Sequence, residues 1–355
     1  MTADLVVAGA GMAGLVAAAE AIALGARAAV LERGDRAGGS MLLSSGVVWR
    51  YRDFETFRAE CPGGDPALQR LVFERLDGDL RWLESLGARV VGRDTGNPRT
   101  TGARFEPRSL VDALLETAGT EVRLGVPLQD LPDGGPVVLA TGGFQADREL
   151  VREHVTPEAD HLMLRAAPCS AGDGLRLGLA AGAALSAGME QIYGRNMPAP
   201  PARVREGDLV RLAQLYAHHA TVTNERGEGH EVRTWSEIDV VQWTARQPRA
   251  RAWFEVERSA LVERVRDRTV GDMVEAAVQA GAPVERSGGS VKIETVAGIT
   301  STLGGLRIDD HARVEAGVFA AGGDAGGIAT GGYASGLASA LVLGRIAARS
   351  ALGVA

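Results

Sequence analysis

The stretch that decides the fold is DLVVAGAGMAGLVAAAEAIALGARAAVLE, residues 4–32. Asp4 to Ala8 is a short apolar run, which predicts a buried parallel strand. Met12 to Leu24 is rich in alanine and contains no proline, which predicts a helix. Ala28 to Leu31 predicts a second strand, and Glu32 closes it. The stretch therefore has the length and order of one strand–helix–strand unit.

The turn between the first strand and the helix is Gly9-Ala10-Gly11-Met12-Ala13-Gly14, which fits the pattern GxGxxG. The first glycine permits a tight turn, the second lets the backbone approach a pyrophosphate, and the third lets helix and strand pack closely. The helix start offers N–H groups and a positive dipole end to phosphates. Glu32 stands where an acid can accept hydrogen bonds from ribose hydroxyls. Together these features predict a dinucleotide site, with a plain glycine turn as the alternative.

Composition excludes several classes of partner. The net charge is −7 and no basic block occurs, which argues against nucleic acid and anionic membrane surfaces. Cys61 and Cys169 form no CxxC pair, so neither a disulfide framework nor a zinc site is expected, and no metal is predicted. No apolar run reaches about 18 residues, so no membrane span is expected. The opening residues lack a cationic leader region, which favours a mature cytoplasmic protein.

The rest of the chain alternates between two textures. The pattern predicts helices at Glu55 to Leu86, where a Pro-Gly-Gly-Asp-Pro turn interrupts the stretch, at Pro107 to Ala118 and at Ser335 to Ser350. It predicts strands at Glu121 to Leu124 and at Pro136 to Ala140. After Gly143 the chain becomes richer in Arg, Trp, His and Pro. Short apolar runs with glycine turns, as in the first part of the chain, return at Gly298 to Gly305. We therefore predict a first domain in two parts, residues 1–145 and 291–355, with a capping or substrate domain inserted at 146–290.

Several further segments carry a resemblance to a known family. They are Gly38-Gly39-Ser40, Ser44-Ser45-Gly46, Ala140-Thr141-Gly142-Gly143, Ser170-Ala171-Gly172-Asp173-Gly174, Leu303-Gly304-Gly305, Gly322-Gly323-Asp324 and the run from Gly331 to Gly344. With the opening stretch they resemble the flavoprotein family of fumarate reductases, L-aspartate oxidases and 3-ketosteroid dehydrogenases. The resemblance spans nearly the whole chain in the right order. It implies an α/β fold: a Rossmann-type FAD-binding domain, glutathione-reductase-like, with an inserted α+β capping domain.

The resemblance also implies which residues contact FAD. They are Gly9, Gly11 and Gly14 at the pyrophosphate, Glu32 at the adenosine ribose, Gly39, Ser40, Ser45 and Gly46 on the flavin side, Val126 near adenine, Thr141 and Gly142 near the pyrophosphate, Asp324 at the ribityl chain, and Ser335, Gly336, Leu337 and Ala338 at the flavin ring carbonyl. A helix start in that last place suits a reduced flavin, because its dipole stabilises negative charge. Further expected FAD contacts are Met12, Ala13, Arg33, Ala140 and Gly323.

The mode of FAD binding is indicated by the absence of a histidine at one position. Succinate-dehydrogenase members tether FAD through a His near the first loop, and here Gly39 holds that place. The resemblance therefore implies that FAD binds non-covalently.

The charged groups that bind dicarboxylates in the family are mostly absent. Their positions fall on Arg195, Thr300, Gly331 and the neighbourhood of Trp235. A site with so few cations has little reason to prefer a C4 dianion, so fumarate, succinate and aspartate are not expected as substrates.

The candidate catalytic residues are Tyr193, Arg195, Trp235, Tyr333 and Ala334. A tyrosine can donate to a ketone oxygen or move a proton, and backbone N–H groups after Tyr333 can hold an enolate oxygen. Each has an ordinary alternative: aromatic rings pack, and Arg195 could form an ion pair.

Three functions stay open at this point. The first is an FAD-dependent dehydrogenase or reductase acting on a C–C bond beside a carbonyl in a non-dicarboxylate, ring-containing small molecule, with hydride transfer at flavin N5. The second is a C–N or C–OH dehydrogenase or oxidase, and the third is a non-redox isomerase or hydratase that carries flavin. The expected partners are a small-molecule substrate and an unidentified electron donor or acceptor.

Overall fold

The glycine-rich opening folds as one strand–helix–strand unit in the computed structural model, which describes residues 3–354. β1 (Leu5–Ala8) runs into α1 (Met12–Ala23), and α1 leads to β2 (Ala28–Glu32). β1 and β2 pair in parallel, with Leu5 opposite Ala28. Leu5, Val7 and Ala8 of β1 and most of α1 are buried, as a parallel sheet covered by helices requires. This confirms the predicted βαβ opening.

The chain divides into two units. Unit 1 runs up to Asp147 and adds Ala166–Gln191 and the chain from Ser301 onward, while unit 2 comprises Arg148–Arg165 and Ile192–Thr300. Residues 166–191, which the sequence places in the inserted domain, thus group with the first unit. The two units are described separately below.

Unit 1 is built around a six-stranded sheet of order β17-β18-β7-β1-β2-β6. Its other strands are β6 (Val122–Leu124), β7 (Val137–Leu139), β17 (Arg313–Glu315) and β18 (Val318–Ala320). All neighbours pair in parallel except β17 and β18. The carboxyl ends of β1, β7 and β18 therefore meet at one edge, where ligands bind in open α/β sheets.

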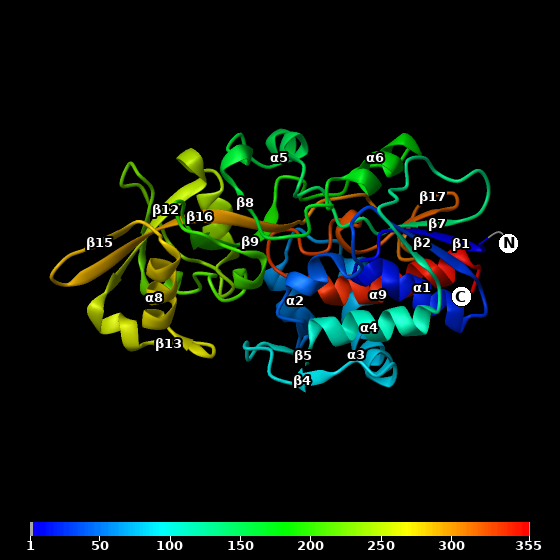
Figure 1. Ribbon diagram of the computed structural model, residues 1–355, viewed down its shortest axis with the longest axis horizontal. Coiled ribbons are helices and arrows are strands. Elements are labelled where there is room, and N and C mark those ends of the chain that lie inside the picture. The colour runs from blue at the N-terminus through cyan, green and yellow to red at the C-terminus, as the bar shows by residue number, and fades with distance from the viewer. Residues whose placement is uncertain (1–2, 355) are drawn as a thin grey trace. The chain divides into compact units, whose positions relative to one another are not determined.

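Helices of unit 1 complete its core. They are α2 (Phe54–Glu60), α3 (Pro66–Ser85), α4 (Pro107–Ala118), α6 (Asp173–Ala180) and α9 (Gly336–Ala351). α1 packs along α9, and Figure 1 shows these two helices side by side. A small antiparallel sheet of order β3-β5-β4, formed by Val47–Tyr51, Thr100–Phe105 and Val90–Gly92, completes the unit.

Unit 2 is a mixed α+β structure. Its long central strand is β16 (Ser290–Thr302), which continues into unit 1 at its end. The strands are β8 (Met163–Leu164), β9 (Ile192–Pro198), β10 (Thr221–Thr223), β11 (Gly229–His230), β12 (Arg251–Glu257), β13 (Arg264–Val265), β14 (Arg268–Thr269) and β15 (Val284–Arg286). The helices are α5 (Arg148–His154), α7 (Ile238–Thr244) and α8 (Val270–Ala280). α8 packs on a buried apolar cluster that includes Phe254 and Ile293.

Candidate functional site

The glycine turn after β1 leaves a surface that a phosphate can approach. Gly9 has φ +102°, and a Cβ there would lie 2.2 Å from the carbonyl oxygen of Ala140. A Cβ on Gly14 would lie 1.9 Å from the carbonyl oxygen of Gly9. At Gly11, by contrast, a Cβ would meet nothing within 4 Å. Gly9 and Gly14 are therefore required by packing, while Gly11 keeps the start of α1 open, as a bound pyrophosphate needs.

A second glycine turn lies against the first. The N–H of Gly38 donates to the carbonyl of Ala10 at 2.7 Å, and a Cβ on Gly39 would lie 3.4 Å from the Cα of Gly11. Gly39 has φ +50° and begins a short 3-10 helix. Ser40 accepts a hydrogen bond from the N–H of Ala167 at its Oγ, 2.9 Å away. The fold thus brings together two glycine segments that the sequence separates by almost 30 residues.

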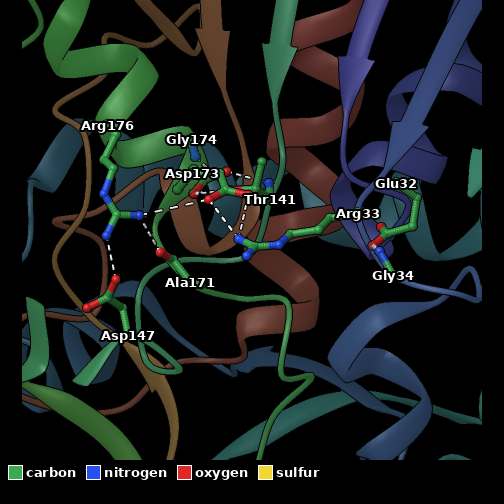
Figure 2. A network of polar contacts seen from close by, with 10 residues as sticks. Glu32, Arg33, Gly34, Thr141, Asp147, Ala171, Asp173, Gly174 and Arg176 are labelled. Carbon is green, nitrogen blue, oxygen red and sulfur yellow. Dashed lines mark hydrogen bonds and ion pairs between the residues drawn. The ribbon is translucent and has the colours of Figure 1, made fainter. Parts of the chain in front are cut away.

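The carboxylate of Glu32 ties the end of β2 to the glycine turn. Its Oε2 accepts from the N–H of Ala10 at 2.7 Å. Its Oε1 accepts from the N–H of Gly34 at 2.6 Å, and Figure 2 shows these two residues next to each other. Glu32 is 8% exposed. Because a carboxylate offers about four lone-pair directions, acceptor capacity remains for ribose hydroxyls. The main-chain N–H of Val126, the residue predicted near adenine, donates to the carbonyl of Glu32 at 2.8 Å.

Arg33 belongs to a chain of ion pairs at the start of α6. Its guanidinium lies 3.0 Å from the carboxylate of Asp173, and Arg176 donates to the carbonyl of Ala171 and pairs with Asp147. Figure 2 shows Arg33 and Arg176 reaching toward Asp173 from opposite sides. Both arginines are about half exposed, so these pairs fix geometry more than they add stability. Contact of Arg33 with a cofactor stays a prediction.

Asp324 joins the ends of β7 and β18. Its carboxylate accepts hydrogen bonds from the N–H and hydroxyl of Thr141 and from the N–H of Gly143. The hydroxyl of Thr141 in turn accepts from the N–H of Gly174 at 2.9 Å. Asp324 is 1% exposed, and burial raises its pKa while these hydrogen bonds act to lower it. The carboxylate holds the Thr141 turn in place, and its predicted contact with a ribityl chain is untested.

The start of α9 follows directly on Tyr333 and Ala334. Ser335 is buried and caps the helix, since its hydroxyl accepts from the N–H of Ala338 at 3.2 Å. The N–H groups of Gly336 and Leu337 are in the first turn, where no helix carbonyl is available to them. The ring of Tyr333 lies 5.3 Å from that of Trp49. This end of α9 can therefore offer N–H donors and a positive dipole end to an anionic or carbonyl oxygen.

Three of the five predicted catalytic residues lie in unit 2. Arg195 is 5% exposed, donates to the carbonyl of Ser236 and lies over the ring of Tyr193 at 5.3 Å. Trp235, next to Ser236, carries the guanidinium of Arg266 over its ring at 5.5 Å. The guanidinium of Arg195 thus contacts both the ring of Tyr193 and the carbonyl of Ser236, the residue after Trp235. Tyr333 and Ala334 belong to unit 1.

Glu237 adds an acid beside Arg195 that the sequence did not single out. Its φ is +57°, a left-handed conformation that non-glycine residues rarely adopt. It is buried, which raises its pKa, and the neighbouring Arg195 acts in the opposite direction. Arg195 thus has an acidic neighbour inside unit 2, and its guanidinium is already hydrogen-bonded to the carbonyl of Ser236.

Sequence reasoning also missed Arg165. This residue is buried, and its guanidinium donates to the hydroxyl of Thr300 at 2.6 Å and to the carbonyl of Leu209 at 2.9 Å. A single arginine within the apolar run Leu162-Met163-Leu164 to Ala166-Ala167 was the available signal. A cation thus lies beside Thr300, although Thr300 itself carries none.

Within residues 3–354, no group of three His, Cys, Asp or Glu side chains is placed to hold a metal ion. In the same residues, no helix is long and apolar enough to cross a membrane.

Comparison with known proteins gives one family and a set of similar structures. The model of the FAD binding domain family matches residues 4–128 and 131–339. Comparison with curated protein sequences gave no match.

The similar structures include a flavocytochrome c3 fumarate reductase in its open conformation, with TM-score 0.75, 19% identity, and coverage of 99% of this chain and 78% of that one. The 3-ketosteroid-Δ4-(5α)-dehydrogenase of Rhodococcus jostii RHA1, in complex with 4-androstene-3,17-dione, has TM-score 0.73 and 21% identity, with coverage of 99% of this chain and 96% of that one. The 3-ketosteroid Δ1-dehydrogenase of Sterolibacterium denitrificans, in complex with 1,4-androstadiene-3,17-dione, has TM-score 0.74 and 15% identity, with coverage of 99% of both chains. These matches confirm the predicted fold class and the predicted resemblance.

Proposed function

The chain belongs to the FAD binding domain family of oxidoreductases, and we propose that it oxidises or reduces a C–C bond beside a carbonyl in a ring-containing small molecule that is not a dicarboxylate. FAD, when bound, accepts or donates the hydride at flavin N5. We further propose that FAD binds without a covalent bond. The residues present fit the cofactor, since Gly11 leaves the start of α1 open and Glu32 keeps acceptor capacity beside it.

The main support for a substrate that is not a dicarboxylate comes from the residues around Arg195. Its guanidinium donates to the Ser236 carbonyl, and the acid Glu237 lies beside it. The buried guanidinium of Arg165 likewise donates to Thr300 and Leu209. A C4 dianion would have to displace these internal bonds, and leaving buried partners unpaired is costly. A neutral ketone makes no such demand.

The neutral groups at the predicted site suit a carbonyl. The hydroxyl of Tyr333 can donate to a carbonyl oxygen or move a proton at the neighbouring carbon. The N–H groups of Ala334 and of the first turn of α9 can stabilise an enolate oxygen, because the helix dipole adds to their partial charges. We propose Tyr333 and Ala334 of unit 1 for these roles. Within unit 2, we propose the rings of Tyr193 and Trp235 as neutral groups that contact a substrate.

An anaerobic screen of the FAD-loaded protein tests this function. Oxidised protein is mixed with succinate and with 4-androstene-3,17-dione, and dithionite-reduced protein with fumarate and with 1,4-androstadiene-3,17-dione, while flavin absorbance is recorded. Smaller cyclic ketones and enones extend the panel, and amines and alcohols test the C–N and C–OH alternative. We expect flavin reduction or reoxidation with at least one cyclic ketone or enone, and none with fumarate or succinate.

Two outcomes contradict the proposal. Fumarate or succinate turnover at about 1 s⁻¹ or faster, an ordinary enzymatic rate, would show that the buried arginines do bind a dianion. Conversion of a ketone with no change in flavin absorbance would favour a non-redox isomerase or hydratase.

A further inference from the structure

The peptide groups on both sides of Tyr333 are held by buried side chains of unit 1. The hydroxyl of Tyr51, at the end of β3, donates to the carbonyl of Tyr333 at 2.6 Å. Tyr51 is 4% exposed, and burial is the main reason why its pKa lies far above the ordinary value. It therefore stays a phenol, and a hydrogen-bond donor, throughout the working pH range. On the other side, the main chain of Tyr333 hydrogen-bonds to the thiol of Cys61, whose pKa burial raises to about 12.

Aromatic packing fixes the ring of Tyr51 in this position. Trp49 and Tyr51 are two residues apart on β3, so they lie on the same face of the strand. The ring of Trp49 lies 5.3 Å from that of Tyr51 and 5.3 Å from that of Tyr333, edge to face in both cases. The ring of Phe57 also packs against that of Tyr51, with the ring centroids 5.4 Å apart. The hydroxyl has little freedom to turn away from its acceptor.

The segment that leads to Tyr333 is also held in place. Gly63 donates to the carbonyl of Thr330 at 3.0 Å, and the side chain of Gln69 donates to the carbonyl of Ile328 at 2.8 Å. A Cβ on Gly332 would lie 1.7 Å from the carbonyl oxygen of Glu60, so only glycine fits there. The chain therefore reaches Tyr333 along a fixed path over the turn between α2 and α3.

The geometry of a peptide bond extends this control to the next residue. The carbonyl of Tyr333 and the N–H of Ala334 belong to one planar trans peptide, in which they point in opposite directions. A donor that fixes the carbonyl therefore also fixes the N–H. We propose that Tyr51 is a positioning residue, whose hydroxyl aims the N–H of Ala334 and the start of α9 at the reacting carbonyl and the flavin. The inference rests on the proposed function for the chemistry of this N–H, while the hold on the main chain is independent of it.

Tyr51→Phe tests the proposal, because it keeps the ring and removes only the donor. Tyr216→Phe is the matched control, since Tyr216 is a fully buried tyrosine of unit 2 whose hydroxyl has no hydrogen-bond partner among residues 3–354. Both proteins are loaded with FAD, and FAD content, thermal midpoint, flavin absorbance spectrum and reduction potential are measured. We expect Tyr51→Phe to retain FAD and fold but to shift the flavin spectrum and potential. With a substrate, kcat should fall about tenfold with KM little changed, as expected for one hydrogen bond used mainly in the transition state. Tyr216→Phe should change none of these.

A third variant separates this proposal from the proposed function. Tyr333→Phe keeps the carbonyl that Tyr51 holds, so it should leave the flavin spectrum unchanged and lower turnover alone. If no ketone reacts but Tyr51→Phe still shifts the spectrum, the proposed function fails and the positioning role stands. A wild-type spectrum, potential and kcat in Tyr51→Phe would overturn the positioning role.

Trp49→Phe decides the matter if Tyr51→Phe does not fold. This variant keeps an aromatic ring beside Tyr51 and leaves the Tyr51 hydroxyl as donor to the carbonyl of Tyr333, so the flavin spectrum should stay as in the wild type. A shifted spectrum would show that ring packing sets the segment, and the proposal would then be abandoned.

Discussion

Glu32 shows how one side chain can serve both the fold and a ligand. Its carboxylate accepts from the N–H of Ala10, which follows β1, and from the N–H of Gly34, which follows β2, and it is almost fully buried. A carboxylate in this position keeps the glycine turn and the end of β2 at a fixed distance. The acceptor capacity that remains points to hydroxyl groups such as those of ribose. Loss of the charge should therefore be felt by the cofactor.

We predict that Glu32→Gln weakens FAD binding by about 10–150-fold, the range for a lost hydrogen bond to a charged acceptor. The amide can accept at one oxygen only, and its NH2 group faces an N–H donor. FAD titration of the apoprotein, followed by flavin fluorescence, measures the effect. Asp35→Asn removes the same charge from an exposed neighbour and should leave affinity unchanged. Equal affinity in Glu32→Gln and wild type would remove Glu32 from the ribose site.

At this scale the sequence predicted what depends on neighbours along the chain. Gly9, Gly11 and Glu32 could be assigned because their spacing in one short stretch defines the turn. Tyr51 could not be assigned, because its acceptor is 282 residues away and an aromatic residue on a strand is usually packing alone. Glu237 was missed for a similar reason, since neither its burial nor its left-handed backbone is visible in composition.

Among the elements, α1, α3 and α9 are joined by buried charges. Glu20 in α1 is 1% exposed, and its two oxygens lie 2.8 Å from Nε of Arg345 and 2.6 Å from Nε of Arg349, both in α9. Arg345 also pairs with Asp79 of α3 and lies over the ring of Trp82 at 4.5 Å. The helix that begins beside Tyr333 is thus anchored at its far end to the helix that begins at the glycine turn.

We predict that Glu20→Gln lowers the free energy of unfolding by about 3 kcal/mol, because it leaves Arg349 without this carboxylate and Arg345 with Asp79 alone. Urea unfolding, followed by circular dichroism, measures the change. The control is Glu74→Gln, which removes the exposed Arg70–Glu74 pair on α3 and should leave the midpoint unaltered. A change in Glu20→Gln no larger than in this control would show that the network contributes geometry alone.

Elements with a strong local pattern were predicted, and those that depend on distant pairing were not. α4 follows the predicted range because Pro107 can begin a helix and Gly119, with φ +52°, can end it. The sheet β3-β5-β4 has no such signal, because Val47–Tyr51 and Thr100–Phe105 pair across about 50 residues. Yet β3 is the strand that carries Trp49 and Tyr51 to Tyr333.

On the scale of the whole molecule, unit 1 is assembled from three separate parts of the chain. Asp324, Thr141 and Gly174 come from the three parts and are joined by hydrogen bonds. The sequence placed residues 166–191 in the inserted domain because they lie between two Arg- and His-rich stretches. Nothing in their composition indicated that the chain re-enters unit 1 there. Contacts that could reveal this return, such as Gly174 against Asp324, exist only after folding.

This assembly makes cofactor binding and folding of unit 1 depend on each other. The glycine turns, Glu32 and the start of α9 lie far apart in sequence, so unfolding unit 1 should separate the groups that we assign to FAD. The single histidine in its sequence is His311, in the turn after Asp309, and Gly39 occupies the place of the family's tethering histidine. No covalent bond should therefore retain the flavin after unfolding.

We predict that heat or acid releases FAD from the purified protein and that added FAD raises its thermal midpoint. A ligand that binds only the folded state stabilises it by about 2.7 kcal/mol at a free concentration 100 times Kd, and the gain grows with concentration. Flavin absorbance of the supernatant after precipitation measures release, and thermal scans over a series of FAD concentrations measure the linkage. Glu32→Gln should need more FAD for the same rise, because its affinity is lower. Flavin that stays with the precipitated chain, together with a midpoint independent of added FAD, would indicate a covalent bond that neither Gly39 nor the rest of unit 1 leads us to expect.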